Sequence, residues 1–211
     1  HKVKSNYEKY SQVRSTSGKT GREVAEEILH ANGIYDVDVV KGEGFLTDHY
    51  DPNKKVVCLS PANFDRPSVA GTAIAAHEVG HAIQHQQGYA FLRFRTALVP
   101  LANIGSSLSY IVIMAGIFLT ALGSAFGSTA LWIGAGLMSL AVLFSIVTLP
   151  VEFDASSRAM KQITALNIVN EKEYKHARKV LSAAAMTYVA ATATAVAELV
   201  RIILLARAND N

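Results

Sequence analysis

The sequence has 211 residues, enough for one domain or two small ones, and its formal net charge is only +3. So small a positive charge does not indicate a nucleic-acid-binding protein, and we expect no nucleic acid among its partners. Cys58 is the only cysteine, so no internal disulfide can form, and this suits a reducing compartment.

The first part of the chain is predicted to be a small polar unit of helices and one β-hairpin. The first 17 residues are polar and show no clear period. A helix is predicted over residues 20–33, where Thr20 and Glu23 have the spacing of a capping box. A β-hairpin is predicted at roughly residues 44–60, because an Asp-Pro-Asn turn is followed there by strand-forming residues.

The middle of the chain has the composition of membrane spans, since no Asp, Glu, Lys or Arg occurs from Thr96 to Val151. Two apolar stretches within this run, Leu98–Leu122 and Ala130–Leu149, have the roughly 20 residues that cross a bilayer. The short uncharged link between them predicts a tight helical hairpin. After a charged helical segment, the Ala-rich stretch Ala183–Ala206 is interrupted by only one Glu and one Arg, and is predicted to be a third span.

Basic residues indicate the orientation of these spans. Twelve Lys and Arg precede Thr96, six lie in residues 151–182, and the hairpin link contains none. By the positive-inside rule, both charged segments face the cytoplasm. Two crossings also return the chain to its starting side, so residues near position 80 can meet residues near position 152.

A second helix, predicted from about Ser68 to Gln87, contains the H-E-x-x-H motif His77-Glu78-Val79-Gly80-His81. Residues four apart lie one above the other on a helix, so both imidazoles can reach one ion, and Glu78 is placed beside them to hold a water. Zn²⁺ lowers the pKa of a bound water towards neutrality, and the carboxylate takes its proton as the water attacks a carbonyl. The alternative is a polar helix face without metal.

A catalytic zinc ion needs a third protein ligand and an open position. We predict Glu152, because it is the first charge after the hairpin and the topology returns it to the side of His77. Asp154 is placed to compete for the ion or to orient a ligand imidazole. His85 lies about 12 Å along the helix axis from His77, at ~1.5 Å per residue, and is predicted to be a supporting or surface residue. His49 is either a ligand, a transition-state contact or an ordinary loop histidine.

The site is predicted at or just above the membrane surface, because residues 67–88 are too polar and too short for a span buried in lipid. We expect a membrane-associated polypeptide substrate that pairs with an exposed strand. The candidate strand is "KKVVCLS", Lys54–Ser60, and its alternative is a plain structural strand. Arg158 and His176 are weaker candidates for steadying an oxyanion, as is Tyr188 if it lies near that face.

Four stretches occur in order around the first two spans: "LTDHYDP", "AAHEVGHAIQHQ", "LPVEFDASSRA" and "VLSAAAMTYVAA". They resemble the bacterial YugP-type neutral zinc metallopeptidases over essentially the whole chain. The resemblance implies a membrane-embedded, zinc-dependent endopeptidase of the glutamate-ligand class, with ligands His77, His81 and Glu152 and with Glu78 as catalytic base. The broader relatives, HtpX-like and prenyl-protein proteases, share a soluble zinc helix tied to membrane spans.

Two features depart from that family. Its relatives usually carry an acid four residues after the third ligand, where this chain has Ser156, so support for an imidazole is expected from Asp154 or elsewhere. Family members also tend to begin with an apolar span ahead of "KVKSNYEKY". This chain opens on His1 without an apolar leader or a visible signal peptide, so we expect that it lacks that first span.

The predicted fold class is a mostly α integral membrane protein with a zincin-like cytoplasmic unit that contains a β-hairpin. Its predicted segments are the cytoplasmic zinc helix segment (1–95), the helical hairpin (96–150), the cytoplasmic return segment with the third ligand (151–182) and a C-terminal span with its tail (183–211). The predicted function is that of a multi-pass cell-membrane zinc metalloendopeptidase, with one Zn²⁺ per chain and its active site facing the cytoplasm. Two alternatives stay open: a non-catalytic zinc-binding membrane scaffold or adaptor, and a metal-free protein whose histidines form a pH-sensitive surface. The sequence indicates no particular oligomeric state or regulatory partner.

Overall fold

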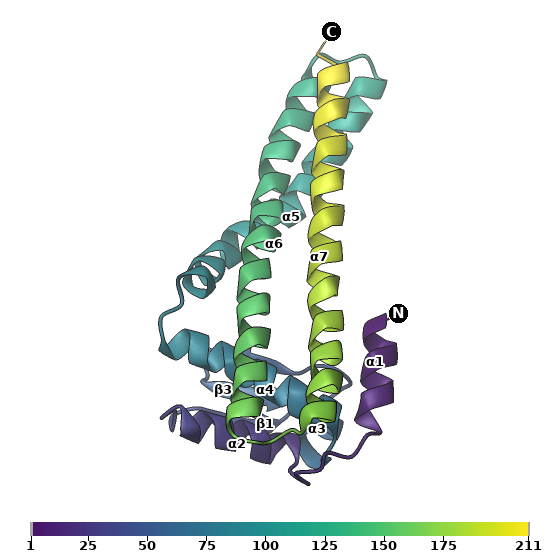
Figure 1. The fold of residues 1–211 in the computed structure, drawn as a ribbon. Coiled ribbons are helices and arrows are strands. Elements are labelled where there is room, and N and C mark those ends of the chain that lie inside the picture. The colour runs from purple at the N-terminus through teal and green to yellow at the C-terminus, as the bar shows by residue number, and fades with distance from the viewer. Residues whose placement is uncertain (1, 211) are drawn as a thin grey trace. The chain divides into compact units, whose positions relative to one another are not determined.

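Helices make up most of the computed structural model, which describes residues 2–210, and three short strands form one sheet (Figure 1). This confirms the predicted fold class, a mostly helical membrane protein with a small β unit. The elements, in chain order, are α1 (Lys2–Ser11), α2 (Gly21–Ala31), β1 (Asp38–Lys41), β2 (His49–Asp51), β3 (Val56–Leu59), α3 (Pro61–Asp65), α4 (Val69–Gln86), α5 (Ala90–Ala121), α6 (Phe126–Ala165) and α7 (Glu171–Ala208).

The chain divides into two compact units, each built from two segments. The first unit contains the residues up to Leu92 together with Val151–Thr187, and the second contains Arg93–Pro150 together with the residues from Tyr188 onward. The four-segment division predicted from the sequence is not tested by this grouping and stays a prediction.

The first two helices of the first unit form for different reasons. The predicted helix over residues 20–33 is α2, and its capping box is present, because the Thr20 side chain accepts from Glu23 N while the Glu23 carboxylate accepts from Thr20 N. No helix is predicted in the first 17 residues, yet α1 forms there and buries Tyr7 and Tyr10 in the core of this unit. Tertiary burial of two aromatic rings therefore outweighs a polar composition with no clear period.

The sheet has the strand order β1-β3-β2. The predicted hairpin is confirmed as the antiparallel pair β2 and β3, with Tyr50 opposite Val57. Strand β1, which no sequence pattern predicts, pairs with the other edge of β3 in the parallel direction. The prediction that residues 54–60 offer an exposed strand to a substrate is therefore wrong, because both edges of β3 are paired within the sheet. Within the described part of the chain, β1 and β2 are the edge strands of this sheet, and α4 packs against β2 and β3.

The second unit contains the apolar parts of the long helices. Among the described residues α5, α6 and α7 are each long and apolar enough to cross a membrane, which agrees with the three predicted spans. The chain turns between α5 and α6 at Gly123, whose φ of +74° is a conformation that glycine adopts without strain. At Gly134 an added Cβ would lie 2.4 Å from the Ile113 side chain, so a small residue lets α5 and α6 approach closely.

Candidate metal centre

Helix α4 carries the H-E-x-x-H motif through the core of the first unit. Its N-terminus is capped by Ser68, whose Oγ accepts a hydrogen bond from Gly71 N at 3.0 Å. At Gly80, inside the motif, an added Cβ would lie 2.6 Å from the carbonyl oxygen of Ala155 on α6. The glycine therefore lets α4 and α6 approach closely at the level where the two histidines face Glu152.

His77, His81 and Glu152 are brought together by this crossing. Their possible ligand atoms all lie within 4.8 Å of one another. His77 Nε2 is 3.3 Å and His81 Nε2 is 3.7 Å from Glu152 Oε2, and the Glu152 side chain is only 4% exposed. Two imidazole nitrogens and one carboxylate oxygen thus converge on one small, mostly buried volume.

The donor set and its spacing fit a zinc ion. Zn²⁺ binds nitrogen and oxygen ligands at ~2.0–2.2 Å in a tetrahedron, which places the ligand atoms roughly 3.3–3.6 Å apart. The two nitrogen–oxygen distances to Glu152 are close to this separation. Two imidazoles and one carboxylate are also the ligands of one common type of catalytic zinc site, in which the fourth position is left open.

Glu78 follows His77 on α4 and is 9% exposed. Burial raises the pKa of its carboxyl above the ordinary value, against the opposing effect of His77 and His81. Among the described residues, no side chain or backbone group forms a hydrogen bond with this carboxylate. A carboxylate with a raised pKa and no protein partner is suited to hold a water and accept its proton.

The two imidazoles are supported by neutral side chains. His77 Nδ1 lies 3.1 Å from the hydroxyl of Ser156, so a neutral hydroxyl contacts the first histidine of the motif. His81 Nδ1 lies 3.0 Å from Gln84 Oε1, and Gln84 Nε2 donates to Asp154 Oδ2 at 2.8 Å. Asp154 therefore reaches an imidazole only through Gln84, a residue that the sequence analysis misses. The available signal was a glutamine one turn after His81 on the same helix.

The other two candidate histidines contact residues outside the group formed by His77, His81 and Glu152. His85 is exposed, and its Nδ1 lies 2.8 Å from the hydroxyl of Tyr50, so it connects α4 to strand β2. This agrees with a supporting or surface position for His85. His49 Nδ1 lies 2.8 Å from the carbonyl oxygen of Thr47, as in an ordinary loop histidine.

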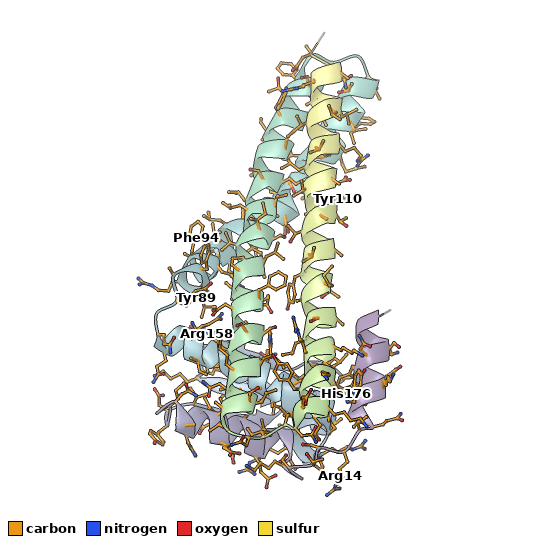
Figure 2. The ribbon with its side chains drawn as sticks, in the orientation of Figure 1. Arg14, Tyr89, Phe94, Tyr110, Arg158 and His176 are labelled. Carbon is orange, nitrogen blue, oxygen red and sulfur yellow. The ribbon has the colours of Figure 1, made fainter. Side chains whose placement is uncertain are left out.

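Arg158 forms a clamp between α6 and the end of α4. Its Nε donates to Asp154 Oδ2 at 2.5 Å and its Nη1 donates to Gln87 Oε1 at 2.6 Å. The guanidinium also lies 5.7 Å from the centre of the Tyr89 ring (Figure 2). These hydrogen bonds use two of the five N–H donors of the guanidinium, and the predicted oxyanion role of Arg158 stays a prediction.

His176 and Tyr188, the other oxyanion candidates, both lie on α7. The ring of His176 stacks on Tyr10 of α1, with 4.6 Å between the ring centroids, so it belongs to the contact between these helices (Figure 2). Tyr188 is the first residue of the C-terminal segment of the second unit, and its predicted role stays a prediction.

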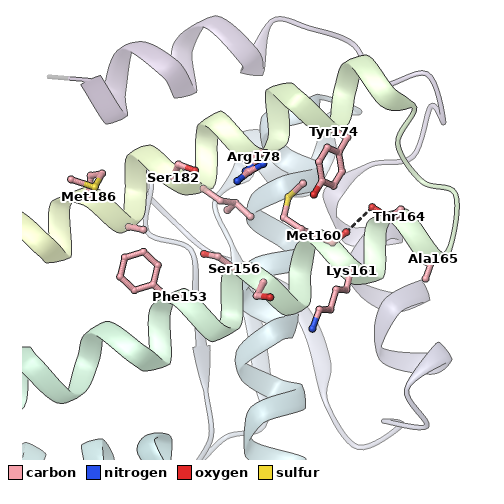
Figure 3. Close-up of a pocket in the computed structure, with 13 residues that line it drawn as sticks. Phe153, Ser156, Met160, Lys161, Thr164, Ala165, Tyr174, Arg178, Ser182 and Met186 are labelled. Atoms are coloured by element: carbon pink, nitrogen blue, oxygen red, sulfur yellow. Dashed lines mark hydrogen bonds between the residues drawn. The ribbon is translucent and has the colours of Figure 1, made fainter.

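A hollow of about 920 Å³ lies in the first unit between the part of α6 that carries Phe153 and Ser156 and the part of α7 that carries Arg178 and Met186 (Figure 3). It adjoins the candidate centre at Ser156, whose hydroxyl faces Nδ1 of His77, the ring nitrogen directed away from Glu152. None of His77, His81 and Glu152 is among the residues that line this hollow.

A helix-borne H-E-x-x-H motif, a glutamate from a second helix and three apolar helices are together the features of a membrane metallopeptidase. The chain belongs to the family described as "Putative neutral zinc metallopeptidase", whose model matches residues 1–207. It is also 44% identical over 204 residues to "Putative membrane protease YugP" of Bacillus subtilis (strain 168), and this match covers 97% of the chain and 88% of that relative. No solved structure matches the chain. The resemblance predicted from the four sequence stretches is confirmed.

Proposed function

We propose that the protein is a membrane-embedded zinc metalloendopeptidase that holds one zinc ion per chain with His77, His81 and Glu152. The observation that carries this proposal is the convergence of three ligand atoms within 4.8 Å beside a buried carboxylate, that of Glu78. Membership of a zinc metallopeptidase family supports the same assignment. The substrate is a polypeptide, as the description of the Bacillus relative as a protease suggests.

In the proposed peptide hydrolysis, the zinc ion and Glu78 have separate roles. When bound, Zn²⁺ supplies a Lewis acid that polarises the scissile carbonyl and makes a bound water more acidic. Glu78 orients the attacking water through a hydrogen bond, accepts its proton, and passes that proton to the leaving amine. Burial favours this exchange because it raises the pKa of Glu78 and so makes the carboxylate a stronger base.

The active site faces the cytoplasm in this proposal. The argument is the distribution of Lys and Arg, which are frequent before Thr96 and in residues 151–182 and absent from the link between the first two spans. The protein is thus a multi-pass protein of the cell membrane that cleaves membrane-associated chains near the cytoplasmic surface.

Zinc content per chain, measured by elemental analysis of detergent-purified protein, tests the ligand set. We expect one zinc in the unaltered protein and in Glu78→Gln, because that substitution leaves all three ligands in place. His81→Ala and Glu152→Ala are expected to lose most of the zinc. His85→Ala is the matched control, since it removes another α4 histidine but no ligand. Full zinc retention in Glu152→Ala would contradict the third ligand.

Cleavage of an unfolded polypeptide in detergent separates the peptidase from a non-catalytic zinc scaffold. Loss of the base in Glu78→Gln is expected to lower the turnover number by about 10²- to 10⁴-fold while zinc stays bound. Equal cleavage by Glu78→Gln and the unaltered protein, or no cleavage by a zinc-loaded unaltered protein, would favour the scaffold.

A further inference from the structure

Gln84 is a buried amide that uses all of its polar atoms next to the candidate centre. It lies on α4, one turn after His81, and is 0% exposed. Its Nε2 donates to the carbonyl oxygen of Val151 and to Asp154 Oδ2, both at 2.8 Å, while its Oε1 lies 3.0 Å from His81 Nδ1. One side chain thus links a candidate ligand on α4 to two residues of α6.

The hydrogen-bond partners of Gln84 determine the orientation of its side-chain amide. A carbonyl oxygen and a carboxylate only accept hydrogen bonds, so Val151 and Asp154 both require the NH₂ end of Gln84. If the amide were turned over, its oxygen would face two other oxygens at hydrogen-bonding distance. The amide oxygen therefore faces His81, and only a hydrogen on His81 Nδ1 can complete that contact. The other ring nitrogen, Nε2, is then left with a lone pair and lies 3.7 Å from Glu152 Oε2.

Asp154 is held from its other side by Arg158, whose Nε donates to the same Oδ2 atom that Gln84 contacts. Arg158 in turn donates to Gln87 near the end of α4. The carboxylate is therefore fixed between an amide and a guanidinium, and it cannot turn away without breaking a hydrogen bond to a charged group.

His77 is supported in a different way. Its Nδ1 faces the hydroxyl of Ser156 at 3.1 Å, and a hydroxyl can either donate or accept. This contact accommodates either tautomer, whereas the contact of Gln84 selects one tautomer of His81. The contacts of the motif thus determine which ring nitrogen of His81 carries the hydrogen, but they do not determine this for His77.

We propose that Gln84, braced by Asp154 and Arg158, is the positioning residue that holds His81 in its zinc-binding tautomer. This inference rests on the proposed function, because it concerns a ligand of the proposed zinc site. Hydrogen-bond partners of zinc ligands typically contribute 10- to 100-fold to metal affinity, which sets the size of the expected effect.

Zinc dissociation constants, measured by competition with a chromogenic chelator, test the inference without reference to catalysis. Gln84→Met keeps the length of the side chain but removes all three hydrogen bonds, and is expected to weaken zinc binding about 10- to 100-fold. Gln162→Met is the matched control, because Gln162 also links two elements of this unit, by donating to Asn32 Oδ1 at 3.1 Å. The control is expected to keep the zinc affinity of the unaltered protein.

A rescue variant distinguishes hydrogen bonding from simple packing. In Gln84→Glu, one oxygen of the introduced side chain still accepts from His81 Nδ1, and a proton shared with the neighbouring Asp154 carboxylate lets the other oxygen donate to Asp154 Oδ2, which Arg158 continues to contact. We expect this variant to bind zinc within about tenfold of the unaltered protein, since a carboxylate is also a common partner of ligand histidines. Affinity as weak as that of Gln84→Met would overturn the inference.

A measurement on the unaltered protein covers the case in which Gln84→Met fails to fold. In the zinc-loaded protein, ¹⁵N NMR of the histidine rings is expected to show His81 bound through Nε2 with its hydrogen on Nδ1. Binding through Nδ1 would overturn the inference. If the unaltered protein binds no zinc, the proposed function fails and the inference with it. If zinc binds and depends on Glu152 but Gln84→Met binds it as tightly, only the inference fails.

Discussion

The pKa of the Cys58 thiol depends on burial and on nearby charges of the first unit. It lies on β3 and is partly exposed. Burial raises the pKa of its thiol above the ordinary value, and the charges of Asp48 and Glu78 act in the same direction. Since the thiolate is the reacting form, a higher pKa leaves less thiolate at any given pH below it.

We therefore expect iodoacetamide to alkylate Cys58 more slowly at pH 8 than it alkylates a cysteine in an unstructured peptide. The rate should continue to rise with pH beyond the point at which the peptide rate levels off. Mass spectrometry gives the rate without ambiguity, because the chain has one cysteine. The denatured protein is the control and should behave as the peptide does. A native rate that levels off together with the peptide rate would contradict this prediction.

Short sequence features position helices α6 and α7. Helix α6 presents Glu152, Ala155 and Ser156 towards α4, at a spacing of three and four residues that defines one helix face. Helix α7 begins with a reciprocal cap, in which Glu173 N donates to Asn170 Oδ1 and Asn170 N donates to the Glu173 carboxylate. Each feature orients a helix that supports the candidate centre or its unit.

Glu173 also joins α7 to the segment after α1. Its carboxylate is buried and accepts from both the backbone N and the hydroxyl of Thr16, at 2.6 and 2.7 Å. Because Glu173→Ala removes several hydrogen bonds to a charged group, we expect it to lower the free energy of unfolding by about 2–3 kcal/mol. The measurement is chemical denaturation in detergent, followed by circular dichroism.

Glu171→Ala is the matched control for this prediction. Glu171 is on the same turn of α7 but its side chain is 87% exposed and pairs with Lys175 at 3.0 Å. An exposed pair of this kind contributes little, so we expect a change below about 0.5 kcal/mol. Equal effects of the two substitutions would refute a special role for the Glu173 contacts.

For the molecule as a whole, the arrangement of charge along the chain predicts the side of the membrane on which each end of the proposed spans lies. The segments before Thr96 and over residues 151–182 are rich in Lys and Arg, and the link between α5 and α6 has no charge. Anionic lipids of the cytoplasmic leaflet attract segments that are rich in Lys and Arg.

Labelling with a membrane-impermeant maleimide tests this orientation. In a Cys58→Ala background, we expect Lys54→Cys to react only after the cells are permeabilised, because it lies in the first unit. Ala125→Cys, in the link between α5 and α6, is expected to react in intact cells. Reaction of Lys54→Cys in intact cells, with Ala125→Cys protected, would reverse the orientation and place the proposed site outside.

Several features were predictable because they depend on neighbours along the chain or on simple counting. The pair His77 and His81 follows from a spacing of four residues on a helix. The parity of two predicted membrane crossings puts Glu152 on the same side as this pair, and the structure shows that the three residues lie close together. The capping box at Thr20 and the hairpin of β2 and β3 likewise rest on local propensities, and the structure contains both.

Other features were decided only by the tertiary structure, because they are contacts between side chains far apart in sequence. Gln84 reaches Asp154 across 70 positions and Tyr50 reaches His85 across 35. Strand β1 pairs with β3 although no local pattern marked it, and its presence places β3 at the centre of the sheet. The sequence by itself determined the motif, the three spans and the donor types of the site. Packing decided which neutral side chains support the two imidazoles, because hydrogen-bond partners are chosen by position in space.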